Sequence, residues 1–250
     1  MIRLKTEEQI KRIEEACVLT AELMRRLSTF MEPGMSTSHV DQFCYSFITQ
    51  NKGVPAFLNY GGFPASACIS INEEVIHGIP SKTRIIAEGD LVDIDIGIDL
   101  DGHFSDMART FIIGTTSEEN ERLNTVTEES LRLGIAAADK KGARIQDISR
   151  AVYKHAKSHG YGVVRDYCGH GVGLAVHESP EIPNYTSSYL PNPRLREGMV
   201  LAIEPMINMG TSKVRVLADG WTVVTADGLP SSHFEDTVAV TKDGLKVLTV

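Results

Sequence analysis

The 250-residue sequence has few cysteines, few aromatic residues and no long apolar run. Its four cysteines, Cys17, Cys44, Cys68 and Cys168, lie far apart without a C-x-x-C pair, which argues against a zinc knuckle or a disulfide framework. No segment approaches the roughly 20 apolar residues that span a bilayer, and residues 1–6 contain no apolar signal region. We therefore expect a cytoplasmic protein with free thiols and no membrane partner.

The composition is that of an ordinary globular protein. Hydrophobic residues make up 42% and charged residues 23%, and a chain of this length can bury one large core or two small ones. The formal net charge of −8 argues against a nucleic acid as the substrate.

Apolar residues recur at helical spacing in two stretches of each half of the chain. Thr6-x-x-Gln9 predicts a capping box at the first helix, and Pro33-Gly34 ends that helix. Helices are predicted over residues 6–30, 37–50, 117–138 and 145–159. Strands are predicted over residues 66–71, 91–99, 103–113, 199–207, 214–217, 221–225 and 233–240. Two helices followed by strands, twice, predict a duplicated α+β unit. Because no Pro- or Ser-rich linker separates the halves, we expect a single domain over residues 1–250.

Residues 91–99 alternate with a period of two. One face carries Ile94, Ile96 and Ile98, and the other carries Asp93, Asp95, Gly97 and Asp99. A two-residue turn at Asp101-Gly102 would pair Asp106 with Gly97, and a four-residue turn would pair it with Asp95, so either turn puts Asp95 and Asp106 on one side. Crowded carboxylates raise each other's pKa unless a cation intervenes. The pattern indicates a metal site or, alternatively, a solvated polar face of a sheet.

Three histidines lie in glycine-rich or apolar settings. Glycines flank His170 on both sides and allow close approach of the backbone to whatever the imidazole binds. His177 follows seven residues later, and His77 lies in an Ile-His-Gly-Ile-Pro turn. A single histidine is more often structural than a ligand, but three in such settings favour a common site.

Two glutamates, Glu204 and Glu235, interrupt strands that otherwise read as core. Buried acids are costly unless they are paired or bind a metal, although either strand could be an edge strand with its acid facing water. Together with Asp95 and Asp106 they bring four negative charges, which two divalent cations would cancel, with His170 as a neutral ligand. Such oxygen-rich ligation suits Mn, Fe or Co at least as well as Zn.

From about Lys5 to its end, the chain resembles the type I methionine aminopeptidases of the pita-bread fold family. The motifs that match are Ile-His77-Gly-Ile-Pro, Asp93-Ile-Asp95, Ser105-Asp106, Cys-Gly-His170-Gly-Val-Gly, Leu-Ala-Ile-Glu204-Pro-Met and Phe-Glu235-Asp. The resemblance implies an α+β fold in which two pseudo-symmetric helix-helix-strand halves surround a shared, curved, mostly antiparallel sheet.

The resemblance also implies an activity, which is metal-dependent removal of the initiator methionine from nascent proteins and peptides, with a small second residue preferred. Asp106 and Glu235 would bridge two divalent ions (Co, Mn, Fe or Zn), and Asp95 and His170 would bind one each. Glu204 would be both a ligand and the general base for attack by a metal-bridging water on the first peptide bond. His77 and His177 would be donors toward the substrate.

By the same resemblance, the methionine pocket would be lined by Tyr60, Phe63, Cys68, Tyr167, Val176 and Trp221. A monovalent cation would lie near Asn72 and Ser231. The partners would be nascent polypeptide N-termini, the chain would be a monomer, and docking on a ribosome is left open.

Several positions depart from the family pattern without removing a ligand. Gly97 stands where a small hydroxyl residue is usual, Val176 where an aromatic residue is common, and His233 where glutamine is frequent. Ile76 and Asp236 also differ from the usual cysteine and histidine. Two alternative functions are a proline-directed peptidase with the same ligands and a metal-free binding module, but the latter should have lost ligands.

Overall fold

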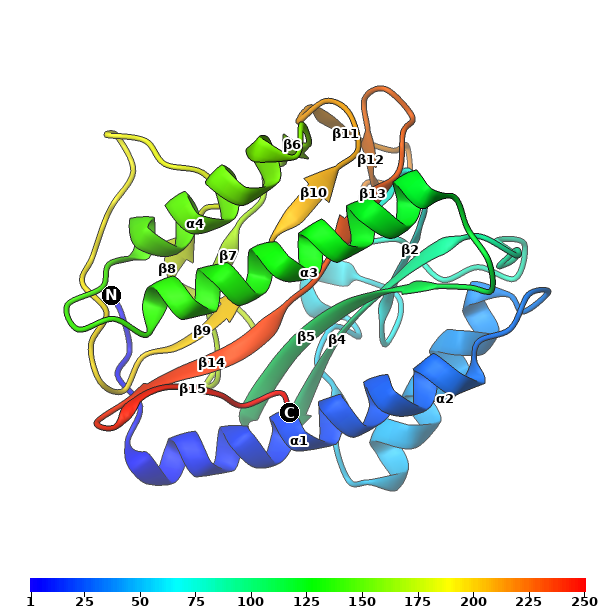
Figure 1. The fold of residues 1–250 in the computed structure, drawn as a ribbon. Helices are drawn as coiled ribbons and strands as arrows, with labels where there is room; N and C mark the ends of the chain where they lie inside the picture. Colours follow the sequence, from blue (N-terminus) through cyan, green and yellow to red (C-terminus); the bar gives the residue numbers. More distant parts are fainter.

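The computed structural model describes all 250 residues as two pairs of helices with strands between them (Figure 1). The first half contains α1 (Glu7–Phe30) and α2 (Thr37–Gln50), and the second contains α3 (Glu118–Ala138) and α4 (Ile145–Ser158). One 3₁₀ turn, η1, covers Tyr60–Gly62. The four predicted helices are confirmed to within about a residue at each end. None of them combines the length and apolar character that crossing a bilayer requires.

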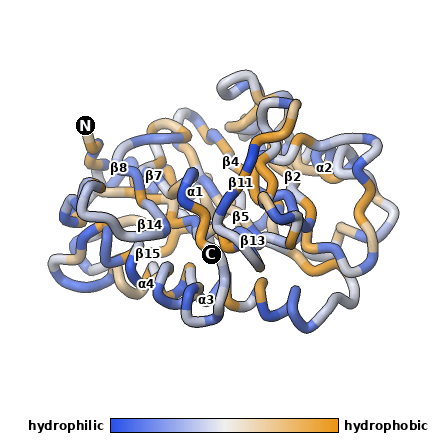
Figure 2. Tube along the Cα trace, turned by 90° about the horizontal axis from the view of Figure 1, so that it is seen from above, coloured by the Kyte–Doolittle hydropathy of each residue, from blue (hydrophilic) through white to orange (hydrophobic).

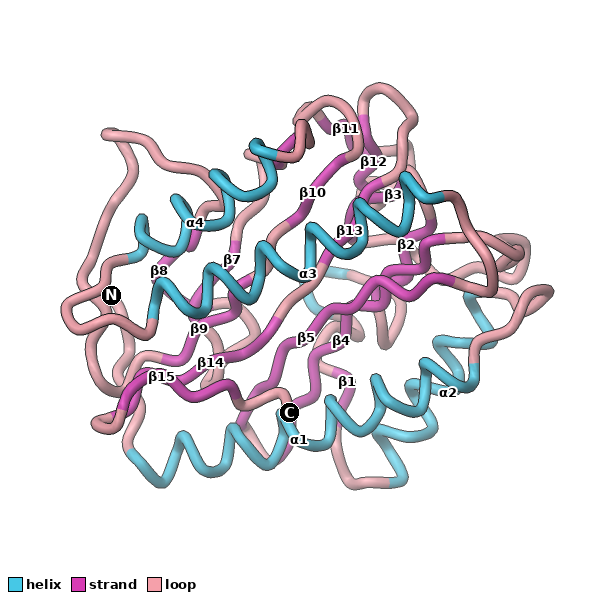
Figure 3. The backbone as a smooth tube through the Cα atoms, in the orientation of Figure 1, coloured by secondary structure: helices cyan, strands magenta, loops and turns pink.

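The strands of the two halves form four small sheets, and every strand pair is antiparallel, as predicted. The first half contributes β1 (Val54–Pro55), β2 (Cys68–Ile71), β3 (Glu74–Ile76), β4 (Leu91–Leu100) and β5 (His103–Ile112). The second half contributes β6 (Gly162–Val163), β7 (Gly169–Gly171), β8 (Glu178–Ile182), β9 (Val200–Ile203), β10 (Met206–Asn208), β11 (Val214–Val216), β12 (Val223–Thr225), β13 (Ser231–His233), β14 (Asp236–Thr241) and β15 (Gly244–Val247). Figure 3 shows these strands running between the two helix pairs.

The helices begin where the sequence places capping residues. The Thr6 hydroxyl accepts from the Gln9 amide, and the Gln9 side chain accepts from the Thr6 amide, which confirms the capping box. The hydroxyls of Ser36 and Ser117 accept from the amides of His39 and Asn120 and so cap α2 and α3. Hydrophilic and hydrophobic residues alternate along α3 and α4 (Figure 2), as expected of helices with one buried face.

The turn between β4 and β5 uses two residues. Leu100 pairs with His103, and Gly97 pairs with Asp106. Asp101 and Gly102 both adopt positive φ, 56° and 76°, as a type I′ hairpin turn requires. Of the two registers left open by the sequence, the one that pairs Asp106 with Gly97 is therefore the one adopted.

Two strands predicted as continuous are each broken in two, so these predictions were wrong. The segment 199–207 divides into β9 and β10 at Glu204-Pro205, and 233–240 divides into β13 and β14 at Phe234-Glu235. Pro205 has no N–H to donate to a ladder. At the second break the Glu235 amide donates instead to the Ala108 carbonyl of β5, which joins the second half to the first.

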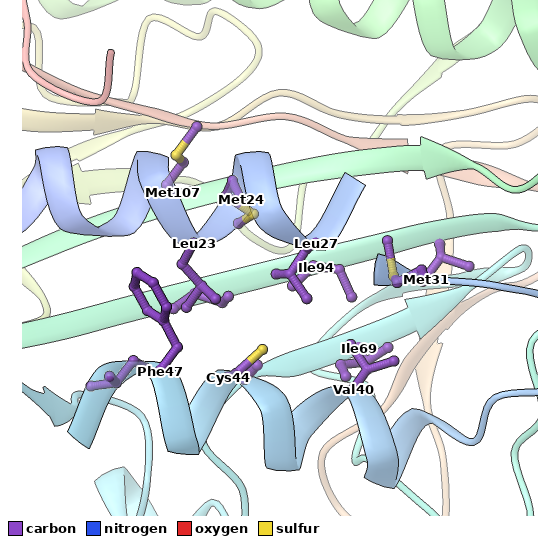
Figure 4. Packing of buried hydrophobic residues seen from close by; sticks show 14 of the residues in the cluster. Leu23, Met24, Leu27, Met31, Val40, Cys44, Phe47, Ile69, Ile94 and Met107 are labelled. Carbon is purple, nitrogen blue, oxygen red and sulfur yellow. The ribbon is translucent and has the colours of Figure 1, made fainter. Parts of the chain in front are cut away.

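Each helix pair covers its own part of the core. Leu23 and Leu27 of α1 and Val40 and Cys44 of α2 pack against Ile94 of β4 (Figure 4). A second cluster joins α3 and α4 to the second half through residues that include Leu131, Ile148, Val152, Leu201 and Ile203. The strands that lie between the two helix pairs are therefore held in place by one apolar cluster or the other. Several buried acids and histidines lie on these strands and beside them.

Candidate metal centre

Five segments of the chain, from two of the sheets and the connections beside them, each contribute one acid or histidine to a common site. The residues are Asp95 on β4, Asp106 on β5, Glu235 between β13 and β14, Glu204 just after β9, and His170 on β7. β4 pairs with β5, β14 with β9, and β9 with β7, while the Glu235 amide bonds to β5. Residues from distant parts of the sequence are thereby held by backbone hydrogen bonds.

The side chains of these residues converge. His170 Nε2 lies 3.4 Å from Glu204 Oε1 and 3.7 Å from Asp106 Oδ2. One ligand atom from each of Asp106, His170 and Glu235 lies within 4.8 Å of the other two. Asp106 and Glu235 are each only 2% exposed, and Asp95 is 9% exposed. The alternative of a solvated polar face is therefore wrong.

Burial perturbs every titratable group in the cluster. Burial, reinforced by Asp93, raises the pKa of Asp95 to about 7, and burial with the charges of Asp95 and Asp93 raises the pKa of Glu204 to about 8. Burial and neighbouring carboxylates also raise the pKa of Asp106 and of Glu235. Burial lowers the pKa of His170 to about 3, which favours its neutral, ligating form.

Several carboxylate oxygens of the cluster lack a hydrogen-bond partner and are therefore available to bind metal ions. Asp95 Oδ1, Asp106 Oδ1 and Glu235 Oε1 are buried without any hydrogen-bond partner. Native proteins rarely leave such atoms unsatisfied, and a bound cation is one of the few ways to compensate several anions at once. The donor set of four carboxylates and one imidazole therefore fits divalent metal ions.

Asp93 and His233 form a buried pair next to Glu204 of the cluster. His233 Nδ1 is 3.4 Å from Asp93 Oδ2, and its Nε2 is 3.7 Å from Glu204 Oε2. Although burial alone would lower it, the negative charges of Asp93, Asp95 and Glu204 raise the pKa of His233 to about 9. Sequence reasoning did not pair these residues, although His233 and Glu235, two apart in an extended segment, suggest a common side.

A cavity of about 170 Å³ opens onto the cluster. Its lining includes all five acid and histidine residues of the cluster and both His77 and His177. The rest of the lining is largely apolar or aromatic: Phe57, Tyr60, Phe63, Cys68, Ile76 and Trp221. Its volume is well below the roughly 300–1,000 Å³ of pockets for larger ligands and suits one amino-acid side chain. A larger open groove of about 840 Å³, between the start of α1 and β14–β15, contains none of these residues.

The pocket residues predicted from the sequence occupy three kinds of position. Tyr60, Phe63, Cys68 and Trp221 line the cavity. Val176 is buried in the apolar cluster behind it, and Tyr167 packs edge-on against His77 at a ring-centroid distance of 5.6 Å. Neither Val176 nor Tyr167 is among the residues that line the cavity itself.

Phe57 is a wall residue that the sequence analysis missed, and it explains Gly97. A Cβ atom at Gly97 would lie 2.8 Å from Phe57 Cε1 and 3.0 Å from Ala56 Cβ. The absence of a side chain at Gly97 therefore gives Phe57 its space beside the first acidic strand.

The two histidines at the cavity are held by aromatic neighbours. His77 has a positive φ of 59° and lies edge-on to Trp221 as well as to Tyr167. His177 stacks on Tyr60 and lies 3.1 Å from the Tyr60 hydroxyl through Nδ1. These contacts orient both rings before any substrate enters.

Asn72 and Ser231, proposed from the sequence to lie near a monovalent cation, are neighbours. The Ser231 amide donates to the Asn72 carbonyl at 2.8 Å, and the Asn72 side chain bridges Asp90 and the Leu91 amide. The cation itself stays a prediction.

Comparison with known proteins agrees with this geometry. Residues 11–242 match metallopeptidase family M24. The chain is 54% identical to a methionine aminopeptidase of Treponema pallidum over 249 residues, covering all of this chain and 96% of that protein. The crystal structure of a methionine aminopeptidase from Rickettsia prowazekii superposes with a TM-score of 0.95 at 39% identity and full coverage of both chains.

A prolidase from Pyrococcus furiosus is more distant, with a TM-score of 0.77 and 27% identity, and only 65% of its length is covered. These similarities confirm the predicted pita-bread architecture, and the chain belongs to metallopeptidase family M24.

Proposed function

We propose that the protein removes methionine from the N-termini of newly made proteins and peptides. The observation that carries this proposal is the cavity of about 170 Å³, whose lining combines the acid cluster with apolar and aromatic side chains. A thioether side chain suits a wall of aromatic rings and a thiol, because sulfur makes favourable contacts with aromatic groups. The first peptide bond of a substrate held in this way would lie over the acids.

In this proposal two divalent ions would be held by Asp106 and Glu235 as shared ligands, by Asp95 and His170 as ligands of one ion each, and by Glu204 as a further ligand. Such ions supply a water activated near neutral pH and a Lewis acid for the carbonyl. Two dications would cancel the four carboxylate charges and would satisfy the unpartnered oxygens of Asp95, Asp106 and Glu235. Co, Mn, Fe and Zn are the candidates, because all accept mixed oxygen and imidazole ligation.

Glu204 is proposed as the general base. Its carboxylate lies at the junction of the cluster and the cavity, 3.4 Å from His170 and 3.7 Å from His233. It would accept the proton released when water adds to the carbonyl and would return that proton to the leaving amine.

His77 and His177 are proposed as donors to the substrate. If the Tyr60 hydroxyl donates to Nδ1 of His177, as their 3.1 Å separation allows, Nε2 carries the proton and can donate to the carbonyl oxygen. Burial lowers the pKa of His77 to about 4, so this ring is a neutral donor at physiological pH. Donors fixed before the reaction stabilise charge that develops during it.

The specificity test is a series of Met-X-Ser peptides, with X varied from Gly to Ile at constant metal, alongside Ala-Pro-type peptides. Methionine before Gly, Ala or Ser should be released, and kcat/KM should fall by at least roughly 10²-fold, about 2.7 kcal/mol, for large or β-branched X. A flat profile across X, or faster release from the Ala-Pro peptides, would replace this proposal with a broad or proline-directed peptidase.

A further inference from the structure

A second group of metal-ligating side chains lies on the helical layer, away from the cavity. His155 and His159 are one turn apart at the end of α4, and Glu129 faces them from α3. His155 Nε2 lies 3.0 Å from Glu129 Oε2, and the two imidazole rings have centroids 4.8 Å apart. None of the three residues lines the cavity at the metal centre.

The three donors are close enough for one ion. One ligand atom from each residue lies within 4.8 Å of the other two. Ligands at the usual zinc distances of about 2.0–2.2 Å are separated from one another by roughly 3–3.5 Å, so the required closure is small. All three side chains are half-buried, which leaves them free to rotate slightly while keeping one side open to water.

The backbone that carries these donors is rigid. α3 and α4 lie side by side (Figures 1 and 3) and share buried residues such as Leu131, Ile148 and Val152. A Cβ atom at Gly134 would lie 3.0 Å from Val152 Cγ2, so glycine at this position permits the close approach of the two helices. The separation between Glu129 and His155 is therefore fixed by packing and does not depend on their own contact.

The chemistry of the donors indicates the class of ion. Two imidazole nitrogens and one carboxylate oxygen suit Zn²⁺, Ni²⁺ or Cu²⁺, whereas Mg²⁺ and Ca²⁺ prefer sites made wholly of oxygen. Two histidines four residues apart project from the same face of a helix, as in helical zinc sites. Three protein ligands leave a position for water.

The contact between His155 and Glu129 could be a plain hydrogen bond that links the two helices, and the His159 side chain would then have no role. A cation site needs His159 as its third ligand. The two interpretations therefore make different predictions for the removal of the His159 side chain. His159 follows the last residue of α4, and its amide is bonded to the Ala156 carbonyl, so its backbone position does not depend on its side chain.

We infer that Glu129, His155 and His159 form a third divalent-cation site, selective for zinc, nickel or copper, which clamps α3 to α4 and takes no part in peptide hydrolysis. An ion bound only by the folded chain stabilises it by mass action, so zinc would raise the melting temperature through this site. Metal content would then exceed that of the metal centre by one ion per chain.

The test is equilibrium dialysis of the full-length protein against zinc alone, with bound metal counted by mass spectrometry. His159→Ala should bind one zinc ion per chain fewer than the wild type, and Glu129→Gln should weaken this ion's binding by at least roughly 10-fold. His39→Ala removes an exposed histidine at the start of α2 and is the matched control. Peptide turnover at saturating metal should be unchanged in all three variants.

The melting temperature gives an independent measurement on the same samples. Zinc should raise it less in His159→Ala than in the wild type or in His39→Ala. Equal zinc content in His159→Ala and the wild type would overturn the site, and so would an equal loss of zinc in His39→Ala. Neither result depends on whether the protein releases methionine.

Discussion

The two faces of strand β4 are both buried, yet they carry opposite chemistry. On one face Ile94, Ile96 and Ile98 are fully buried against the first helix pair. On the other, Asp93 and Asp95 are 3% and 9% exposed and lie within a cluster of acids. Burial of the first face stabilises the fold, whereas burial of the second costs free energy unless cations compensate it.

One face of β4 therefore contributes mainly to the stability of the fold, and the other contributes mainly to function. Substitutions on the isoleucine face should change the free energy of unfolding and leave turnover alone. Substitutions around the acid face should change turnover, and removal of metal should change stability in a pH-dependent manner.

The largest effect is expected for Glu204→Gln. An amide can neither accept a proton from water nor supply the fourth negative charge, so kcat on Met-Ala-Ser should fall by at least roughly 10³-fold, about 4 kcal/mol. Glu181→Gln, which alters an exposed glutamate on the neighbouring β8, is the control and should keep wild-type turnover. Near-wild-type turnover in Glu204→Gln would remove Glu204 from the mechanism.

Ile96→Ala tests the opposite face. Ile96 is fully buried, so the lost contacts and the resulting cavity should lower the free energy of unfolding by about 2–5 kcal/mol, measured by urea denaturation with metal present. The folded fraction should retain its kcat/KM. A loss of activity beyond the unfolded fraction would show that the two faces are not independent.

His177→Ala should lower kcat/KM by on the order of 10²-fold, about 2.7 kcal/mol, because one donor to the transition state is lost. Tyr60→Phe removes the hydroxyl that lies beside His177 Nδ1 and should cost less, since the imidazole itself remains. Steady-state kinetics on one methionyl peptide would measure both. Equal rates for His177→Ala and the wild type would contradict the assigned role.

The smallest effect is the pH dependence of stability in metal-free protein. Asp95 and Glu204 have pKa values of about 7 and 8 in the folded chain, against about 4 when unfolded, so the folded state holds more protons. His233, with a pKa of about 9 when folded against about 6.5 when unfolded, acts in the same direction.

The free energy of unfolding of metal-free protein should therefore fall between pH 7 and 9, by on the order of 1–3 kcal/mol. His77 and His170, whose pKa values are lowered to about 4 and about 3, add little to the pH dependence of stability above pH 7, because they are neutral there in both the folded and the unfolded chain. Saturating Mn²⁺ should displace these protons and flatten the curve. A metal-free curve that is level or rising over this range would mean that the acids are not compensated by protons.

The fold was largely predictable because its signals are local. Alternation in residues 91–99 and the Asp101-Gly102 turn predicted the β4–β5 hairpin, and Thr6 marked the start of α1. The break at Glu204 could have been foreseen from Pro205, whereas no turn residue marks the break at Glu235. There the strand leaves one partner for another, which depends on tertiary contacts.

The site was predictable only in its ligands. Glutamates within apolar strands are locally anomalous, so Glu204 and Glu235 could be identified from the sequence. The Asp93–His233 pair joins residues 140 apart in the sequence, and the cluster of Glu129, His155 and His159 needs the relative position of two helices. Sequence spacing alone does not supply either distance.

The central claim is that the acid face of β4 and its neighbours acts by holding metal ions. Its most direct test is methionine release from Met-Ala-Ser by protein that has been stripped with a chelator, verified free of metal, and then titrated with Mn²⁺, Fe²⁺ or Co²⁺. We predict no release by the stripped protein and recovery with at least one of these ions, because no serine lines the cavity and burial raises the pKa of its one thiol, Cys68, which disfavours the thiolate. Full activity of the verified metal-free protein would contradict the account.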